Sequence, residues 1–322
     1  MRMFSSRAAV VALVLAVAVM SAGCGQIGKI KAKMAVQKGN PAYTAQNYKE
    51  AAQYYEQALQ NDPSMTDLYF FLGNSYDNLY RPAKKGDPTN DAYLTKAVEF
   101  YKKGAEQAQT ASIKQLSLQY LVNTFNSPDK MNDPAQAEPL LLSMIQMDPT
   151  DTRNYFVLSR IYEDAGDYDR AEQQLLTARE KKPKDSSVYM NLAGFYQRQG
   201  NFDKLIEAVQ ERTRQEPTNP EAFYTLATFY WDKAQKDNKL TDAQKATYAD
   251  AGLDAVNKAL DLKSDYNEAL IYKGLLLRTK ATITKNPAEQ QKFLKEADEL
   301  RSKAEELRNK QRSQPQTNAA KK

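Results

Sequence analysis

Hydrophobic residues along residues 154–183 recur with the spacing of two amphipathic helices. Within each helix they fall three or four residues apart, which places their side chains on one helical face. The positions are Tyr155, Leu158 and Tyr162, followed by Ala171, Leu175 and Ala178. Gly166-Asp167 separates the two sets and favours a turn. Pro183 follows the second set and cannot continue a helix, so this stretch predicts one helical hairpin.

The hairpin pattern repeats along the chain. Pro149, Pro183 and Pro217 lie 34 residues apart, each just after the second helix of a repeat. Other copies carry matching residues at Gly39, Ala51, Tyr55 and Ala58; Leu72, Gly73, Tyr76 and Ala97; Ala137 and Leu141; Leu192, Ala193 and Tyr196; Leu226, Ala227 and Tyr230; and Leu270, Gly274, Leu277 and Ala297. This pattern resembles the tetratricopeptide repeat, a helical hairpin of 34 residues.

The resemblance implies an all-α fold, a right-handed α-solenoid of about seven helical hairpins. One hairpin cannot bury its apolar face alone, but stacked neighbours can. Small residues let the paired helices approach closely, so Gly73 is expected opposite Ala97 and Gly274 opposite Ala297. We expect the solenoid to span residues 30–308 and a basic, disordered tail to follow over residues 309–322.

Several repeats depart from the pattern. Repeats 2, 6 and 7 are longer between their two helices, which predicts elongated hairpins. Thr241–Gln244 and Asn286–Glu289 resemble capping boxes, so the second helices of repeats 6 and 7 are expected to begin early. These hairpins are either plain extensions or a ridge that contacts a partner. Repeat 5 has Leu205 and Arg212 where alanine is expected, which indicates either a degenerate packing unit or an unusual contact between repeats.

The N-terminus has the layout of a secretory signal peptide. Arg2 and Arg7 precede an apolar run over residues 8–20, and small residues lead to Cys24. Ala22-Gly23 before a cysteine resembles the lipobox of bacterial lipoproteins, whose cysteine is acylated after cleavage. The resemblance implies a signal peptide over residues 1–23 and an acylated anchor with a short linker over residues 24–29. The alternative is an ordinary cleaved signal peptide with an incidental cysteine.

The composition excludes several kinds of chemistry. Cys24 is the only cysteine and the chain has no histidine, so an internal disulfide, a Cys/His zinc site and a histidine general base are all excluded. The net charge of +5 comes from the leader and the C-terminal tail, so there is no basic stripe for nucleic acid. No nucleophile elbow or phosphate-binding glycine loop occurs. We therefore expect no enzyme activity, cofactor or metal.

The resemblance also identifies candidate binding residues. In tetratricopeptide repeats the first helix of each repeat lines a concave groove at fixed positions. Here those positions include Asn40, Phe70, Asn74, Arg153, Phe156, Arg160, Tyr224 and Trp231. Mixed aromatic, Arg and Asn side chains suit a peptide. Val36 and Phe70 stand where some relatives have lysines that hold a C-terminal carboxylate, so that clamp is not supported. Trp231 either anchors a partner or packs under the inserted hairpin.

Together these features predict a membrane-anchored interaction scaffold or assembly factor in the bacterial cell envelope. It would bind protein or peptide partners in the groove and reach the membrane through an N-terminal lipid anchor, without nucleic acid. Gly25 after the cysteine implies the periplasmic face of the outer membrane, by resemblance to lipoproteins of two-membrane bacteria. The alternative is a peptide- or glycan-capturing receptor for transport.

Overall fold

The computed structural model describes residues 26–313 and the side chains of residues 26–310. The predicted signal peptide, Cys24 and the residues after 313 lie outside this range. Within it the regular elements are helices, with no β-strand. The chain divides into two compact units, the first ending at Ala165 and the second beginning at Gly166.

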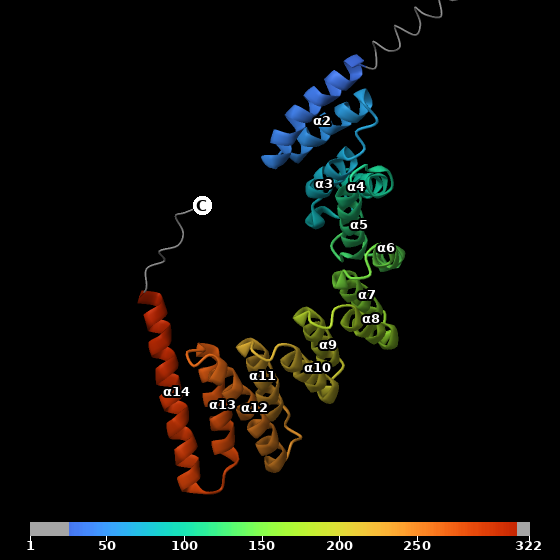
Figure 1. The fold of residues 1–322 in the computed structure, drawn as a ribbon. Helices are drawn as coiled ribbons and strands as arrows, with labels where there is room; N and C mark the ends of the chain where they lie inside the picture. The colour runs from blue at the N-terminus through green and yellow to red at the C-terminus, as the bar shows by residue number, and fades with distance from the viewer. Residues whose placement is uncertain (1–25, 314–322) are drawn as a thin grey trace, which may run out of the picture. The chain divides into compact units, whose positions relative to one another are not determined.

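The first unit is built from successive antiparallel helices, each packed on the next (Figure 1). Its elements are the helix over residues 26–44, α2 (Tyr48–Asn61), α3 (Leu68–Leu79), the short 3₁₀ helix η1 (Pro82–Lys84), α4 (Pro88–Gln107), α5 (Ala111–Asn126), α6 (Pro134–Met147) and α7 (Thr152–Asp164). Contacts between α3 and α5 join neighbouring hairpins. This stacking of hairpins is the arrangement that the repeat pattern predicts.

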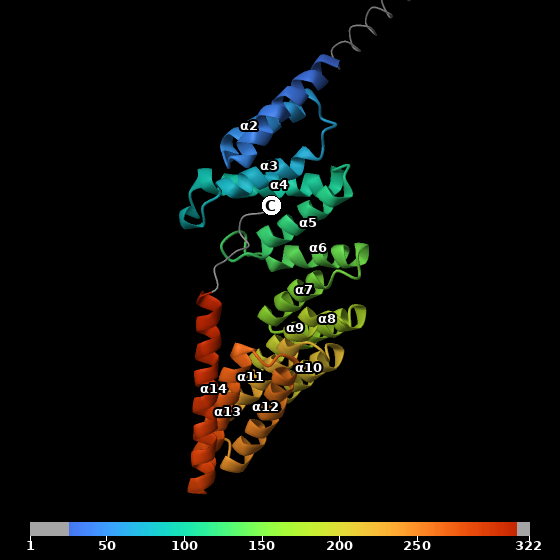
Figure 2. The ribbon, with the colours of Figure 1, turned by 60° about the vertical axis from the view of Figure 1, so that its left-hand side comes forward.

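The second unit continues the same pattern of helical pairs. Its helices are α8 (Tyr168–Lys181), α9 (Ser186–Arg198), α10 (Phe202–Gln215), α11 (Pro220–Lys236), α12 (Asp242–Leu262), α13 (Asn267–Ile283) and α14 (Pro287–Ser313). Figure 2 shows the long α14 lying along α13, its partner in the last hairpin. The predicted all-α solenoid fold is confirmed.

Small residues lie where paired helices meet. Ala97 and Ala297 are fully or almost fully buried. A Cβ atom on Gly274 would lie 3.4 Å from the backbone oxygen of Ala297, as the pattern predicts. A Cβ atom on Gly73 would instead meet the ring of Tyr101 at 2.8 Å. In repeat 2, therefore, the glycine makes room for an aromatic ring one turn beyond the expected alanine.

The predicted elongated hairpins are present in repeats 2, 6 and 7. Helices α4, α12 and α14 have 20, 21 and 27 residues, whereas α2, α8 and α10 have 14 each. Thr241 and Gln244 form a complete capping box at the start of α12. At α14, the Asn286 side chain accepts hydrogen bonds from the backbone N–H groups of Ala288 and Glu289. The extra residues thus lengthen the second helices, as the start signals indicate.

A left-handed residue recurs in the turns within the hairpins. Gly166 and Gly200 have φ values of +79° and +68°, and Gln46 occupies the corresponding turn with φ +62°. Only glycine adopts this conformation without a steric cost.

We expect Gln46→Gly to stabilise the first unit by about 0.5–1 kcal/mol, because it removes this cost at a helix C-terminus. Urea unfolding measures the gain. Gln60→Gly, inside α2, is the matched control and should lose about 1 kcal/mol. A loss of stability in Gln46→Gly would contradict the assignment of strain to this turn.

Candidate functional site

The asparagines predicted to line the groove of the first unit bond to tyrosines that fill the space beside glycines. The Tyr55 hydroxyl donates to Asn40 Oδ1 at 3.1 Å. In the next repeat, the Asn74 amide donates to the Tyr101 hydroxyl at 3.4 Å, and the Tyr43 hydroxyl donates to Asn74 Oδ1 at 2.7 Å. Asn40 remains exposed, whereas Asn74 is only 6% exposed. The polar groups of Asn74 are therefore used inside the unit.

Two further residues complete this internal network. The Tyr101 hydroxyl donates to Asp77 Oδ2 at 3.3 Å, and the Lys130 ammonium lies 2.6 Å from Asp77 Oδ1. Burial raises the pKa of Tyr101 well above its usual value, and the nearby Asp77 carboxylate adds to the shift. The phenol therefore stays neutral and can donate. This arrangement fixes the hairpin of repeat 2 to the loop before α6.

Phe70 is also an interior residue. Its side chain is 6% exposed, and its ring packs edge-on against Tyr120 of α5 at 5.3 Å between centroids. It also contacts Phe71 and Tyr101. Phe70 and Asn74 therefore offer almost no surface to a partner, because residues of α4 and α5 cover the positions that the repeat pattern assigns to the groove.

The predicted residues of α7 lie at the surface. Arg153, Phe156 and Arg160 are three and four residues apart and share one helix face, where the two arginines are exposed and Phe156 is half-buried. Arg153 binds Asp151 through two hydrogen bonds of 2.8 and 2.7 Å, and these bonds raise the pKa of Arg153. Arg160 lies 3.0 Å from the Asp164 carboxylate. This face carries two arginines paired with carboxylates beside a partly exposed aromatic ring.

A pocket of about 240 Å³ opens between α5, α6 and α7 in the first unit. We call it the amide pocket. Its lining residues are Gln119, Val122, Asn123 and Asn126 of α5, Leu141 and Met144 of α6, and Arg153, Asn154 and Val157 of α7. Within the described residues, the side-chain amides of Gln119, Asn123, Asn126 and Asn154 make no hydrogen bond. The pocket thus combines available amide donors and acceptors, one arginine and an apolar floor.

Only Arg153 of the amide pocket was among the residues predicted from the sequence. The first helix of repeat 3 matches the repeat pattern poorly, so no groove positions were assigned to it. The signal that could have found them is the spacing of Gln119, Asn123 and Asn126, which puts three amides on one face of α5.

The second unit contains a cluster of aromatic residues that includes both of its predicted site residues. We call Tyr224, Trp231, Tyr266 and Tyr272 the aromatic cluster. Tyr224 lies 5.2 Å from Tyr266 and 5.3 Å from Tyr272 between ring centroids. Trp231 packs edge-on against Tyr272 at 5.4 Å. Burial raises the pKa of Tyr224 to about 12. All four rings are half-buried, so Trp231 packs on Tyr272 of α13 in the next repeat and retains an exposed face.

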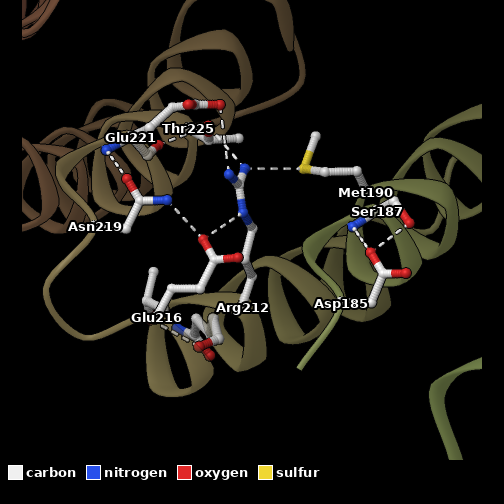
Figure 3. Close-up of polar contacts among 10 residues, drawn as sticks. Asp185, Ser187, Met190, Arg212, Glu216, Asn219, Glu221 and Thr225 are labelled. Atoms are coloured by element: carbon white, nitrogen blue, oxygen red, sulfur yellow. Dashed lines mark hydrogen bonds and ion pairs between the residues drawn. The ribbon is translucent and has the colours of Figure 1, made fainter. Parts of the chain in front are cut away.

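Arg212 makes the unusual contact of repeat 5 (Figure 3). It stands on α10 where the repeat pattern has alanine, and its side chain is only 6% exposed. The guanidinium donates to Glu216, the residue directly after α10, at 3.3 Å and to Glu221 and Thr225 of α11 at 3.4 Å. It also lies 3.4 Å from the sulfur of Met190 on α9. Arg212 therefore joins two repeats through buried polar contacts.

A larger cleft of about 550 Å³ lies between α8, α9 and α10 of the second unit. Its floor includes Leu192 and Tyr196, and its rim carries both acidic and basic residues. Glu172 accepts hydrogen bonds from the Tyr196 hydroxyl and the Lys204 ammonium, both at 2.6 Å. The desolvation of Glu172 is outweighed by these bonds, so its pKa is lowered. At the rim, Arg214 also pairs with Glu211.

Residues 26–313 contain neither a candidate metal site nor a candidate membrane-spanning helix. In that range no three His, Cys, Asp or Glu side chains gather in a way that could hold a metal ion. None of the helices described there combines the length and apolar character needed to span a bilayer.

Comparisons with known proteins identify the repeats. Two tetratricopeptide repeat family matches cover residues 36–108 and 130–194. No curated protein matches the chain significantly. The chain is a tetratricopeptide repeat protein, which is the class of protein that its stacked hairpins define.

One solved structure agrees at the level of the fold, and two others are similar to this chain with lower TM-scores. The C-terminal part of a tetratricopeptide repeat-containing protein from Cytophaga hutchinsonii superimposes with a TM-score of 0.54 at 13% identity, over 84% of this chain and 98% of the other. A tetratricopeptide repeat protein from Parabacteroides merdae gives 0.45 at 12% identity, over 83% and 99%. YrrB, described as having an unusual peptide-binding site, gives 0.39 at 18% identity, over 59% and 89%. The fold supports a protein–protein interaction scaffold in general, and such proteins are generally not enzymes.

Proposed function

We propose that this protein is a lipid-anchored scaffold of the bacterial cell envelope that binds an extended segment of a partner protein in the amide pocket. The observation that carries the proposal is the set of available side-chain amides above an apolar floor, with Arg153 at the rim.

The chemistry of the pocket suits a polypeptide. An extended segment presents N–H and C=O groups that need partners, and amide side chains can satisfy both kinds. The volume of about 240 Å³ is below the roughly 300–1,000 Å³ of small-molecule sites, and it suits one side chain of a longer segment. The half-buried Val157 supplies apolar surface for that side chain, backed by the buried Leu141 and Met144.

The anchor rests on the sequence alone. Arg2 and Arg7, the apolar run over residues 8–20 and Cys24 support export and acylation. Gly25 supports transport to the periplasmic face of the outer membrane, by resemblance to other lipoproteins. Several acyl chains hold a protein on a membrane where one chain would not.

One observation favours a second function, the capture of glycans for transport. Tyr224 and Trp231 of the aromatic cluster are half-buried and both pack against Tyr272, at 5.3 and 5.4 Å between ring centroids. Such rings can stack against the apolar faces of sugars. This alternative would be supported if the natural protein bound an oligosaccharide and the Trp231→Ala variant did not.

The first proposal is tested by crosslinking in cells from a photoreactive amino acid at position 123. The expected result is a specific protein partner, and crosslinks should be absent from the exposed position 112 on the same helix. Cys24→Ser should release the protein from the envelope membrane and remove the partner. If the chain with an intact Cys24 captured no specific protein from position 123, the scaffold proposal would be abandoned.

Removing the polar groups of the pocket should weaken binding of the captured partner segment by at least about a hundredfold. The triple variant Asn123→Ala, Asn126→Ala, Arg153→Ala deletes two neutral hydrogen-bonding groups, each worth about 0.5–1.5 kcal/mol, and one charged group worth about 1.5–3 kcal/mol. The matched control removes the same kinds of group from the exposed face of α2 with Gln53→Ala, Gln60→Ala and Lys49→Ala. Titration calorimetry with the partner segment measures both. Equal affinities for the two triple variants would exclude the amide pocket.

A further inference from the structure

The helix over residues 26–44 has an apolar face that nothing in the described chain covers. One face packs on α2, with Ala32, Ala35 and Gly39 buried. A Cβ atom on Gly28 would meet the backbone oxygen of Asn61 at 2.7 Å, which shows how close the contact is. Away from this face, Ile27, Ile30 and Met34 are 56%, 58% and 55% exposed.

The exposed apolar residues form one stripe along the helix axis. At 3.6 residues per turn, Ile27, Ile30 and Met34 fall within an arc of about 60°, on the side opposite the buried residues. Their spacing of three and four residues makes them neighbours. Single exposed apolar residues are normal on protein surfaces, but a contiguous stripe indicates a contact surface.

Lysines flank the stripe on both sides. By the same helical geometry Lys38 and Lys31 lie about 20° and 40° beyond Ile27 on one edge, and Lys33 lies about 60° beyond Ile30 on the other. Lys29 lies farther round the helix, where its charge acts on Asp62 at the end of α2. Residues 26–44 contain no Asp or Glu. An apolar stripe with lysines on both edges is the pattern of a helix that lies in a membrane interface, because lysine stems cover apolar surface while their ammonium groups reach the headgroups.

The charge pattern selects among possible occupants of this face. A second copy of the chain placed symmetrically on the stripe would bring its lysines against those of the first, and the helix offers no carboxylate to pair with them. Like charges at close range disfavour such a contact. An anionic lipid surface attracts each lysine and accepts the apolar side chains at the boundary between headgroups and acyl chains.

We propose that the helix over residues 26–44 lies flat on an anionic membrane surface, with Ile27, Ile30 and Met34 inserted at the headgroup boundary and the lysines at the lipid phosphates. This inference deepens the proposed anchoring and rests on it for the presence of a membrane. Ile27 follows Cys24 by three residues, so an acylated Cys24 brings the stripe to the bilayer. The anchor and the helix then hold the first repeat in a fixed orientation.

The test uses the full chain with Met34→Cys. An acylated Cys24 leaves the introduced cysteine as the only free thiol, which is labelled with an environment-sensitive fluorophore. The protein is reconstituted into vesicles of phosphatidylcholine with phosphatidylglycerol. The expected result is a blue-shifted emission that nitroxide-labelled lipids quench. Ile271→Cys, an exposed apolar position in the second unit, is the matched control and should remain accessible to aqueous iodide.

The lysines are tested by Lys31→Gln, Lys33→Gln and Lys38→Gln in the same chain. Lipid quenching at position 34 should fall to the level seen in vesicles of phosphatidylcholine alone, since each lysine near an anionic surface contributes about a fivefold effect on binding. An unchanged probe would overturn the electrostatic part of the inference.

Three outcomes would overturn the surface contact. In protein that floats with the vesicles, the probe at position 34 could be as accessible to iodide as the probe at position 271. The probe could become shielded without vesicles as the protein concentration rises, which would indicate a second copy of the chain. It could also be shielded only when membrane proteins are added, which would indicate a protein partner. If Cys24 were not acylated, its thiol would also take the fluorophore, and mass spectrometry would detect this second label. Failure of the anchor is thereby distinguished from failure of the surface contact. The probe at position 34 is then measured in a Cys24→Ser background.

Discussion

Replacing Tyr101 with alanine is expected to destabilise the first unit by about 3–5 kcal/mol. The side chain is fully buried, and its ring fills the space beside Gly73 and packs against Phe70 and Tyr120. Truncating a buried aromatic residue removes its apolar burial and leaves a cavity, which costs about this much in other proteins. The loss is large against the total stability of a typical domain, roughly 5–15 kcal/mol.

Tyr101→Phe separates the ring from the hydroxyl. It keeps the packing but removes the donor to Asp77, so the expected loss is about 1 kcal/mol. The exposed Tyr168 of α8 provides the control, and Tyr168→Ala should change stability by less than about 0.5 kcal/mol. Because the chain has two units, hydrogen exchange resolved by residue is the right measurement. A loss below about 1 kcal/mol for Tyr101→Ala would show that the ring is not a packing centre.

The helical hairpins could be predicted because their signals are local and repeated. Leu158 and Tyr162 share a face whatever the rest of the chain does, and Thr241 with Gln244 specifies a helix start within four residues. The lengthened second helices followed from such start signals. These features need no knowledge of which helix packs on which.

The surface could be predicted only in part, because exposure depends on neighbours that the repeat pattern does not describe. Position alone placed Phe70 and Arg153 in the same groove. Phe70 is buried because Tyr120 of α5 packs against it, whereas no ring covers Arg153. The amides of α5 were missed because the first helix of repeat 3 lacks the residues that define the pattern. The lysines around Ile30 are visible in the sequence, but the exposed apolar face beside them follows only from the burial of its neighbours.

Arg212→Ala is expected to destabilise the second unit by about 2–4 kcal/mol, although it restores the alanine that the repeat pattern prefers. Replacing a residue with the one that is most common at its repeat position often stabilises a protein, and this rule predicts a gain in stability. The structure predicts a loss because alanine would empty a buried site and leave the Glu216 carboxylate, which is 19% exposed, without its cation. Glu221 is 64% exposed and regains water, which places the loss at the lower end of the range for broken buried pairs.

Two further variants identify the cause of the loss at position 212. Arg212→Met fills most of the volume without the charge, so it should recover the packing part of the loss. Adding Glu216→Ala to Arg212→Ala removes the unpaired carboxylate, so the double variant should be more stable than the single one. Arg214→Ala breaks an exposed ion pair with Glu211 on the same helix and should cost less than about 1 kcal/mol.

Urea unfolding with hydrogen exchange in α10 and α11 measures each change. If Arg212→Ala were as stable as the natural protein, the buried guanidinium would be a tolerated substitution in a degenerate repeat. A clear loss that Glu216→Ala partly reverses would establish it as the polar contact that joins repeats 5 and 6.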